Sequence, residues 1–257
     1  MEPLADLREK FDADGFVIVR DYLGSAEVAE VQAQLARYIR EVIPILPKDA
    51  AFFDDYSKEE TLRQMESLEK YDPWFLDFMN RGKHVHLMES FLRDGLNPQG
   101  LEWFDKLPYD QKATPPHQDG FYWCRKPNSA CRLWIALDPV GLENGCLWYS
   151  RGSHLKGIRP HQPSGKLGFS QGIGDFDPNV EDAVPIELNV GDAVCHHSAT
   201  VHWTGVNTTS RHRRALTTVS YGASTVRDEE AFSRYLASMK SQLAARGIQP
   251  GNESARK

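Results

Sequence analysis

The stretch from Thr114 to Lys126 reads TPPHQDGFYWCRK and contains two of the three side chains that a small metal site needs. His117 and Asp119 lie two positions apart, after two prolines and before a glycine and three aromatic residues. In an extended strand alternate side chains point to the same face, so His117 and Asp119 are expected to face one ion, with Gln118 facing away. Because such a pair also arises by chance, a further ligand must come from elsewhere in the chain.

The composition predicts a globular protein with a small ligand. Of 257 residues, 40% are hydrophobic and 11% aromatic, which is enough for a sizeable core in one generous domain or two small ones. A formal net charge of -6, without a dense lysine and arginine cluster, argues against nucleic acid or an anionic membrane as the partner. The acidic N-terminus and the lack of a long apolar run predict a cytoplasmic protein.

The cysteines support the same location. They have no CxxC spacing, so they are expected to be reduced and mostly buried rather than ligands of zinc or members of disulfides. The four are Cys124, Cys131, Cys146 and Cys195.

The N-terminal third is predicted to be mainly helical, because its apolar residues recur every three to four positions. Helices are expected over residues 7–14, 26–43, 58–70 and 74–93. His84 and His86 fall in the last of these. A helix points residues two apart to nearly opposite sides, so this pair is a poor candidate for a metal site.

From Leu101 onward the pattern changes to short strands separated by turn signals. Strands are expected in GLEWFDKLP, SACRLWIALDPV, CLWYS, PIELNV, AVCHHS and RRALTTVSYG. Glu143-Asn144-Gly145 is predicted to form a hairpin turn, and residues 151–182 a long loop that is a candidate lid. A helix is expected at 229–246. Short strands without intervening helices predict a pair of antiparallel sheets or a barrel.

The segment HHSATVHWTGVNTTSRHRRAL offers the missing ligand, since His202 lies on a different strand from His117 and Asp119. Two histidines and one carboxylate on one face leave three coordination positions open, as non-haem Fe(II) requires to hold a cosubstrate and oxygen together. Zinc is the rival metal, although it would normally have a fourth partner.

Four blocks, in order, resemble the phytanoyl-CoA dioxygenase family of Fe(II)/2-oxoglutarate oxygenases. They are F-x-x-D-G-F-V-x-V from Phe11, T-P-x-H-Q-D-G-x-Y-W from Thr114, L-W-I-A-L-D…E-N-G-x-L-x…G-S-H from Leu133, and G-D…H…H-x-x-x-x-N-x-x-S-x-x-x-R from Gly191. The last block departs from the family, because Thr209 and Ser210 stand where a serine is common one place earlier.

The resemblance implies one domain over residues 1–257, folded as a double-stranded β-helix (jelly roll, cupin-like) with flanking helices. The implied parts are a helical region at about 1–95, a β-helix core at about 100–223 and a C-terminal helix at about 227–246. It also implies that His117, Asp119 and His202 bind the iron.

The resemblance further implies that Arg213 anchors the distal carboxylate of 2-oxoglutarate, since a guanidinium offers two parallel donors to a carboxylate. Arg211 and Arg214 are nearby alternatives. Lys106 lies where similar family members carry a lysine, and it is expected to assist Arg213.

The activity so implied is that of a dioxygenase. It would use Fe(II), 2-oxoglutarate and O2 to hydroxylate a small molecule with release of succinate and CO2, and ascorbate is the expected reductant in an assay. Tyr122, Trp123 and Trp148 are the candidate walls of the substrate pocket. Two rival interpretations are a catalytically silent β-helix binding module and a zinc-dependent hydrolase that uses the same pocket.

Overall fold

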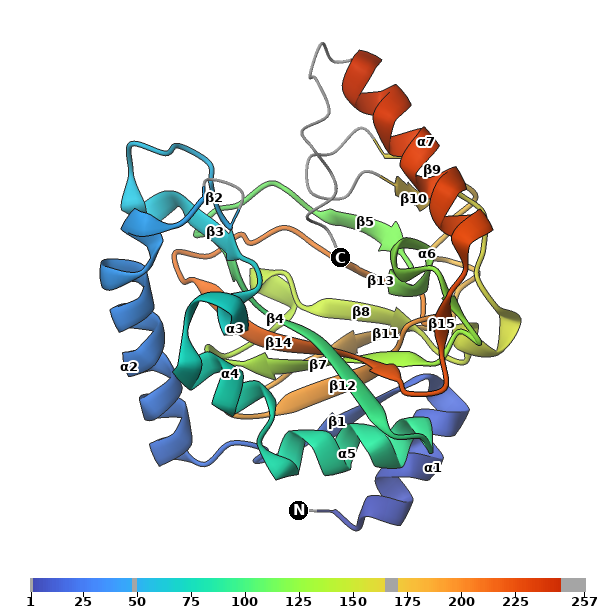
Figure 1. The fold of residues 1–257 in the computed structure, drawn as a ribbon, viewed down its shortest axis with the longest axis horizontal. Helices are drawn as coiled ribbons and strands as arrows, with labels where there is room; N and C mark the ends of the chain where they lie inside the picture. Colours follow the sequence, from blue (N-terminus) through green and yellow to red (C-terminus); the bar gives the residue numbers. More distant parts are fainter. Residues whose placement is uncertain (1, 48–49, 165–170, 246–257) are drawn as a thin grey trace.

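Two antiparallel β-sheets face each other at the centre of the molecule (Figure 1). The computed structural model describes residues 2–47, 50–164 and 171–245. The larger sheet consists, in spatial order, of β1 (Phe16–Val19), β12 (Ala193–His197), β7 (Ala130–Ala136), β14 (Arg213–Gly222), β4 (Leu96–Lys106), β3 (Leu62–Met65) and β2 (Ala51–Phe53). The smaller sheet consists of β11 (Ala183–Ile186), β8 (Leu147–Ser150), β13 (His202–Thr204) and β5 (Thr114–His117). This arrangement confirms the predicted double-stranded β-helix.

Helices and two short β-ribbons complete the fold. The α-helices are α1 (Leu4–Asp14), α2 (Ser25–Glu41), α3 (Leu68–Tyr71), α4 (Pro73–Met79), α5 (Gly82–Leu92), α6 (Asp119–Trp123) and α7 (Glu229–Ala245). The 3-10 helices are η1 (Ile43–Ile45), η2 (Glu59–Thr61), η3 (Leu142–Asn144) and η4 (Ser153–Lys156). The ribbons pair β9 (His161–Pro163) with β10 (Gln171–Ile173) and β6 (Arg125–Lys126) with β15 (Val226–Arg227).

The larger sheet separates two hydrophobic clusters, because side chains alternate between its faces. On the outer face Leu133 and Ile135 pack in one cluster with residues of the N-terminal helices. On the inner face Trp134 packs against Leu147 and Tyr149 of the smaller sheet. The space between the sheets is therefore where inward-pointing polar side chains meet.

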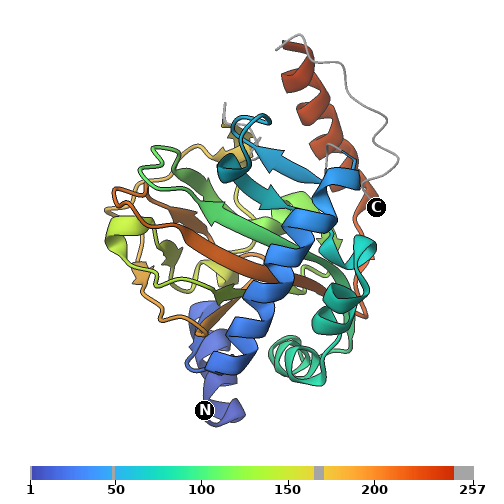
Figure 2. The ribbon, with the colours of Figure 1, turned by 90° about the vertical axis from the view of Figure 1, so that its left-hand side faces the viewer.

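The long helix α2 confirms the helix that the apolar spacing predicted over residues 26–43. Val28, Val31 and Leu35 are buried along one side, and Figure 2 shows the helix running across the molecule. Glu27 accepts a hydrogen bond from the backbone N–H of Gly24, which satisfies one free donor at the helix start.

Gly15 fixes the joint between α1 and β1. Its φ of +83° favours glycine, and a Cβ atom there would lie 2.4 Å from Nδ1 of His154 and 2.6 Å from Oγ1 of Thr200. The D-G block near the N-terminus and the G-S-H block at residue 154 therefore meet at one contact.

The expected helix over residues 58–70 is wrong. That segment forms η2, β3 and α3, and β3 adds to the larger sheet beside β4 with Met65 opposite Trp103. Pairing with β4 and burial of Met65 outweigh the helix propensity of the segment. The region at about 1–95, predicted to be helical, therefore contributes three strands, β1, β2 and β3, to the larger sheet.

The expected helix over residues 74–93 is interrupted. The side chain of Asn80 donates to the carbonyl oxygen of Leu76 and ends α4, and α5 begins at Gly82. His84 and His86 both lie on α5, with His84 buried against Tyr22 and His86 exposed, as the helical geometry predicts.

The turn predicted at Glu143-Asn144-Gly145 exists, but it does not join a hairpin. η3 includes Glu143 and Asn144, and the chain passes from β7 in the larger sheet to β8 in the smaller one. The expected loop over 151–182 contains η4, β9 and β10, while residues 165–170 lie outside the described residues, as does Arg246 at the end of the expected last helix.

All four cysteines are buried and free, as expected. None of the helices in the described part of the chain has the length and apolar character needed to span a bilayer.

Candidate active site

His117, Asp119 and His202 come together between the two sheets. His202 at the start of β13 is directly opposite His117 at the end of β5. Oδ1 of Asp119 lies 3.6 Å from Nε2 of His117 and 3.9 Å from Nε2 of His202. One ligand atom from each residue lies within 4.8 Å of the others, and all three residues are buried. This spacing suits a single metal ion.

The sequence predicted that Asp119 and His117 lie on one strand, and this prediction is wrong. β5 ends at His117, and Asp119 is the first residue of α6. The backbone N–H of Gly120 donates to the carbonyl oxygen of Ser198, which ties the start of α6 to the segment after β12. The turn brings the carboxylate to the same side as the imidazole by bending the chain.

Gln118 faces away from the ligand atoms, and it fastens the loop that follows β8. Its Nε2 donates to the carbonyl oxygens of Gly157 and Ala199, and its Oε1 accepts from the backbone N–H of Arg159. The side chain is fully buried. Thus one residue between two candidate ligands connects the site to the 151–182 segment.

Hydrogen bonds set the orientation of both histidines. Nδ1 of His117 donates to the carbonyl oxygen of Pro115 at 2.9 Å, and Nδ1 of His202 donates to that of Thr200 at 3.0 Å. With the proton on Nδ1, Nε2 carries the lone pair that a metal needs. Burial also lowers the pKa of His202 well below its usual value, so this ring is neutral.

Asp119 is a carboxylate in a buried place. Burial opposes its ionisation, but the adjacent Arg132 guanidinium and a hydrogen bond from His196 hold the pKa of Asp119 well below its usual value. The side chain therefore offers a negative charge near neutral pH.

Arg132 is the site residue that the sequence reasoning did not find. It is a charged residue at an inward-facing position of ACRLWIA, an otherwise apolar strand, and that mismatch was the available signal. Its Nε donates to Oδ2 of Asp119, and its Nη1 donates to Glu102 on β4.

Arg213 lies at the other end of the inner face. It is directly opposite Lys106 in the β14–β4 pair, and its guanidinium lies 5.4 Å from the ring centre of Trp134. Burial lowers the pKa of Arg213 to about 10, which leaves it charged at neutral pH. Among the described residues its buried Nε has no hydrogen-bond partner, so the site is able to take an anion there.

Neighbouring cations occupy different places. Nζ of Lys106 donates to the carbonyl oxygens of Lys112 and Gly205 near Arg213. Arg211 is exposed and pairs with Glu143, and Arg214 pairs with Asp138 through two hydrogen bonds. Of the three arginines, the structure brings Arg213 to the interior.

The three candidate pocket residues have different positions. The ring of Tyr122 lies 6.0 Å from that of His117, and its hydroxyl donates to Gln171. Trp123 packs beside Tyr221 with Arg132 over its ring. Trp148 stacks on Trp203, on the face of β8 opposite to that of Tyr149. Trp148 is thus not brought to the metal cluster.

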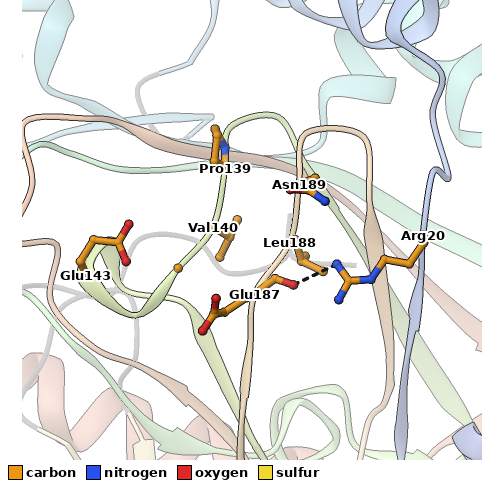
Figure 3. A pocket seen from close by; sticks show the side chains of 8 residues that line it. Arg20, Pro139, Val140, Glu143, Glu187, Leu188 and Asn189 are labelled. Atoms are coloured by element: carbon orange, nitrogen blue, oxygen red, sulfur yellow. Dashed lines mark hydrogen bonds between the residues drawn. The ribbon is translucent and has the colours of Figure 1, made fainter.

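A surface cleft of about 410 Å³ lies elsewhere, between residues 139–143 and 187–189 (Figure 3). Arg20 closes one side and donates to the carbonyl oxygen of Glu187 at 3.0 Å. None of the residues that line the cleft belongs to the metal cluster. The candidate site is therefore defined by its buried side chains rather than by this cleft.

The comparisons with known proteins agree on one family. The family model described as "Phytanoyl-CoA dioxygenase (PhyH)" matches residues 11–215. Phytanoyl-CoA dioxygenase of Arabidopsis thaliana is 31% identical over 68% of this chain and 64% of its own length. The peroxisomal phytanoyl-CoA dioxygenase of Mus musculus is 26% identical over 81% of this chain and 65% of its own length. The chain thus covers less than two thirds of either relative.

A solved structure extends the likeness to the fold. EvdO2 from Micromonospora carbonacea var. aurantiaca, complexed with 2-oxoglutarate, is 26% identical, with a TM-score of 0.68 over 86% of this chain and 91% of that one.

Proposed function

We propose that this chain, which belongs to the phytanoyl-CoA dioxygenase family, is an Fe(II)- and 2-oxoglutarate-dependent dioxygenase that hydroxylates a small molecule. One observation carries the proposal. A buried His117–Asp119–His202 cluster and a buried, incompletely bonded Arg213 lie in the same space between two sheets. A metal and an anionic cosubstrate would satisfy both features together.

The donor set fits iron. Two imidazoles and one carboxylate form the two-histidine, one-carboxylate set that non-haem Fe(II) oxygenases use, with positions left for other ligands. His117 and His202 would bind through Nε2 and Asp119 through Oδ1, since these three atoms face one another. When bound with 2-oxoglutarate and O2, the iron supplies the oxidation that releases succinate and CO2 and hydroxylates the substrate.

Arg213 would hold the distal carboxylate of 2-oxoglutarate. Its guanidinium can donate two parallel hydrogen bonds, and Lys106 adds a second positive charge at the paired position of β4. Thr217 and Trp134, which are also paired in register, lie on the inner face between Arg213 and the level of Arg132. Binding at two ends would fix the orientation of the cosubstrate.

The protein's remaining task is to hold the substrate and exclude water. Tyr122 and Trp123 follow Asp119 directly on α6, and they are the proposed substrate-facing residues. The loop at residues 157–159, which is hydrogen-bonded to Gln118, would cover the substrate on the side of α6. The family names of the relatives support an acyl-CoA thioester as one substrate class to test, and EvdO2-like structures widen the test to other small molecules.

Succinate formation tests the proposal. Anaerobically purified protein is mixed with Fe(II), ascorbate, 2-[1-¹⁴C]oxoglutarate and air, with and without a panel of candidate substrates. We expect ¹⁴CO2 and succinate in equal amounts, and none above background for His117→Ala. Equal signals from the two proteins would sink the proposal and favour a silent binding module, whereas hydrolytic turnover with zinc would favour a metal hydrolase.

A cytoplasmic location is part of the same proposal. The four buried free cysteines support a reducing compartment. Fractionation of cells that express the chain at its natural level tests this, and recovery with an organelle, such as the peroxisome named for the mouse relative, would contradict it.

A further inference from the structure

The two carboxylate oxygens of Asp119 have different neighbours. Oδ1 faces Nε2 of His117 and Nε2 of His202. Oδ2 accepts from Nε of Arg132 at 3.0 Å and lies 3.2 Å from Nε2 of His196. One oxygen is thus directed into the metal cluster, while the other is already engaged by two nitrogen atoms of the protein.

Both partners of Oδ2 are set on the sheet. Arg132 on β7 and His196 on β12 are directly opposite each other in register. Arg132 is held in turn by Oε2 of Glu102 at 2.6 Å and Oγ1 of Thr217 at 3.2 Å, on two further strands. Four neighbouring strands of the larger sheet therefore fix the position of this contact.

The hydrogen bonds of His196 have a defined direction. An ionised Asp119 can only accept, so Nε2 of His196 must carry the proton that is donated to it. On the other side of the ring, Nδ1 of His196 lies 2.7 Å from the hydroxyl of Tyr149, and this contact holds the ring in place. The chain Tyr149–His196–Asp119 thus crosses from the smaller sheet to the larger one.

We propose that Arg132 and His196 are positioning residues that restrict Asp119 to binding the metal through Oδ1 alone. A carboxylate released from both contacts can turn and bind with two oxygens, and the second oxygen would occupy a position needed by cosubstrate or oxygen. The proposal rests on the metal site of the proposed function. Neither Arg132 nor His196 touches the metal or the cosubstrate in this account.

Cobalt(II) is the probe, because its visible spectrum depends on the number of ligand atoms. Metal-free wild type, Arg132→Gln, Arg132→Lys, His196→Leu and His196→Gln are titrated anaerobically with Co(II), and then with 2-oxoglutarate. We expect Arg132→Gln and His196→Leu to bind Co(II) about 10- to 100-fold more weakly and to give altered spectra. Arg132→Lys, which retains the positive charge and most of the length of the side chain, and His196→Gln, which retains a donor, should recover part of both properties.

Arg37→Gln is the matched control, since it breaks an ion pair with the buried Asp72 outside the metal cluster. It should lower the thermal stability of the metal-free protein while it leaves the Co(II) affinity and spectrum unchanged. Thermal unfolding of every metal-free variant identifies those that fold. If Arg132→Gln does not fold, the result for His196→Leu decides the test.

Wild-type Co(II) affinity and spectrum in folded His196→Leu would overturn the inference. Loss of affinity in Arg37→Gln equal to that in Arg132→Gln would also overturn it, because the effect would then follow general stability. A wild-type protein that binds no Co(II) would contradict the proposed function itself, and the inference with it.

Discussion

Arg213 is a cation kept inside the protein, with a buried Nε that lacks a partner among the described residues. Burial of such a group costs free energy unless a ligand supplies the missing acceptor. The sequence could place Arg213 only by its spacing from His202. The structure separates it from its neighbours, because β14 begins at Arg213 and leaves Arg211 outside the strand.

The first prediction concerns this arginine. Arg213→Gln should weaken 2-oxoglutarate binding about 10- to 100-fold, because charged hydrogen bonds contribute roughly 1.5–3 kcal/mol. Arg211→Gln is the control, since Arg211 is exposed and pairs with Glu143; its affinity should stay within about twofold of wild type. Calorimetry with Mn(II)-loaded protein measures both. A larger loss of affinity in Arg211→Gln than in Arg213→Gln would assign the carboxylate to Arg211 and contradict this prediction.

Gly15 gives a second prediction at the scale of one residue. Gly15→Ala should lower the free energy of unfolding by about 2–5 kcal/mol, from the unfavourable φ and the close contact with His154. Gly205→Ala is the control, because a Cβ atom there meets nothing within 4 Å. Urea unfolding of the metal-free proteins measures the difference. Equal midpoints for the two variants would show that the Gly15 contact relaxes freely.

At the scale of elements, local periodicity predicted α2 and most strands of the core, because their apolar faces are continuous and buried. It failed for residues 58–70, where pairing with β4 decides the structure. It also failed at Asp119, where a strand ends and a helix begins within three residues. Such contacts between distant segments leave no trace in the local pattern.

Gln118 links two of these elements and gives a third prediction. Gln118→Leu should remove three side-chain hydrogen bonds to Gly157, Ala199 and Arg159. The backbone N–H of Arg159 should then exchange faster in hydrogen–deuterium exchange, and trypsin should cleave sooner after Lys156. Gln111→Leu is the control, as Gln111 is exposed and bonds only locally to Tyr109. Unchanged exchange at residues 157–159 would mean that Gln118 does not fasten the loop.

At the scale of the whole molecule, the fold keeps several histidines buried and neutral. Burial lowers the pKa of both His84 and His197 to about 4, and nearby cationic or imidazole groups add to the effect. Below an unfolded pKa near 6.5 the unfolded chain takes up protons that the folded chain does not. Stability is therefore fully present above about pH 6.5 and is lost as the pH falls toward about 4.

The fourth prediction follows from this sign. The free energy of unfolding of the metal-free protein should fall between pH 7 and pH 5, by on the order of 1–3 kcal/mol for each such histidine. His84→Gln should flatten the slope, whereas His86→Gln should not, since His86 is exposed on α5. Urea unfolding at a series of pH values measures the slopes. A profile for His84→Gln as steep as that of wild type would contradict the assignment.

The layout of the whole site was only partly predictable from sequence. The resemblance of four blocks placed His117, Asp119, His202 and Arg213 by spacing, but of their surroundings it implied only Lys106 beside Arg213. Arg132 was missed because its partners, Glu102 and Thr217, come from strands far apart in the chain. The sequence predicts Trp148 in the pocket, but it does not show which face of β8 the side chain occupies. The register of β8 with β13, in which Trp148 is opposite Trp203, determines that face.

The most direct test of the central claim is an anaerobic titration of the wild-type protein with Fe(II) and then 2-oxoglutarate, followed by visible absorption. A chelated Fe(II)–2-oxo acid complex absorbs visible light through charge transfer, whereas either component alone gives no such band. We predict a band that saturates at one Fe(II) and one 2-oxoglutarate per chain, and that is absent in Asp119→Ala and shifted to higher 2-oxoglutarate concentration in Arg213→Gln. Saturation with Fe(II) followed by no change on addition of 2-oxoglutarate would contradict the account.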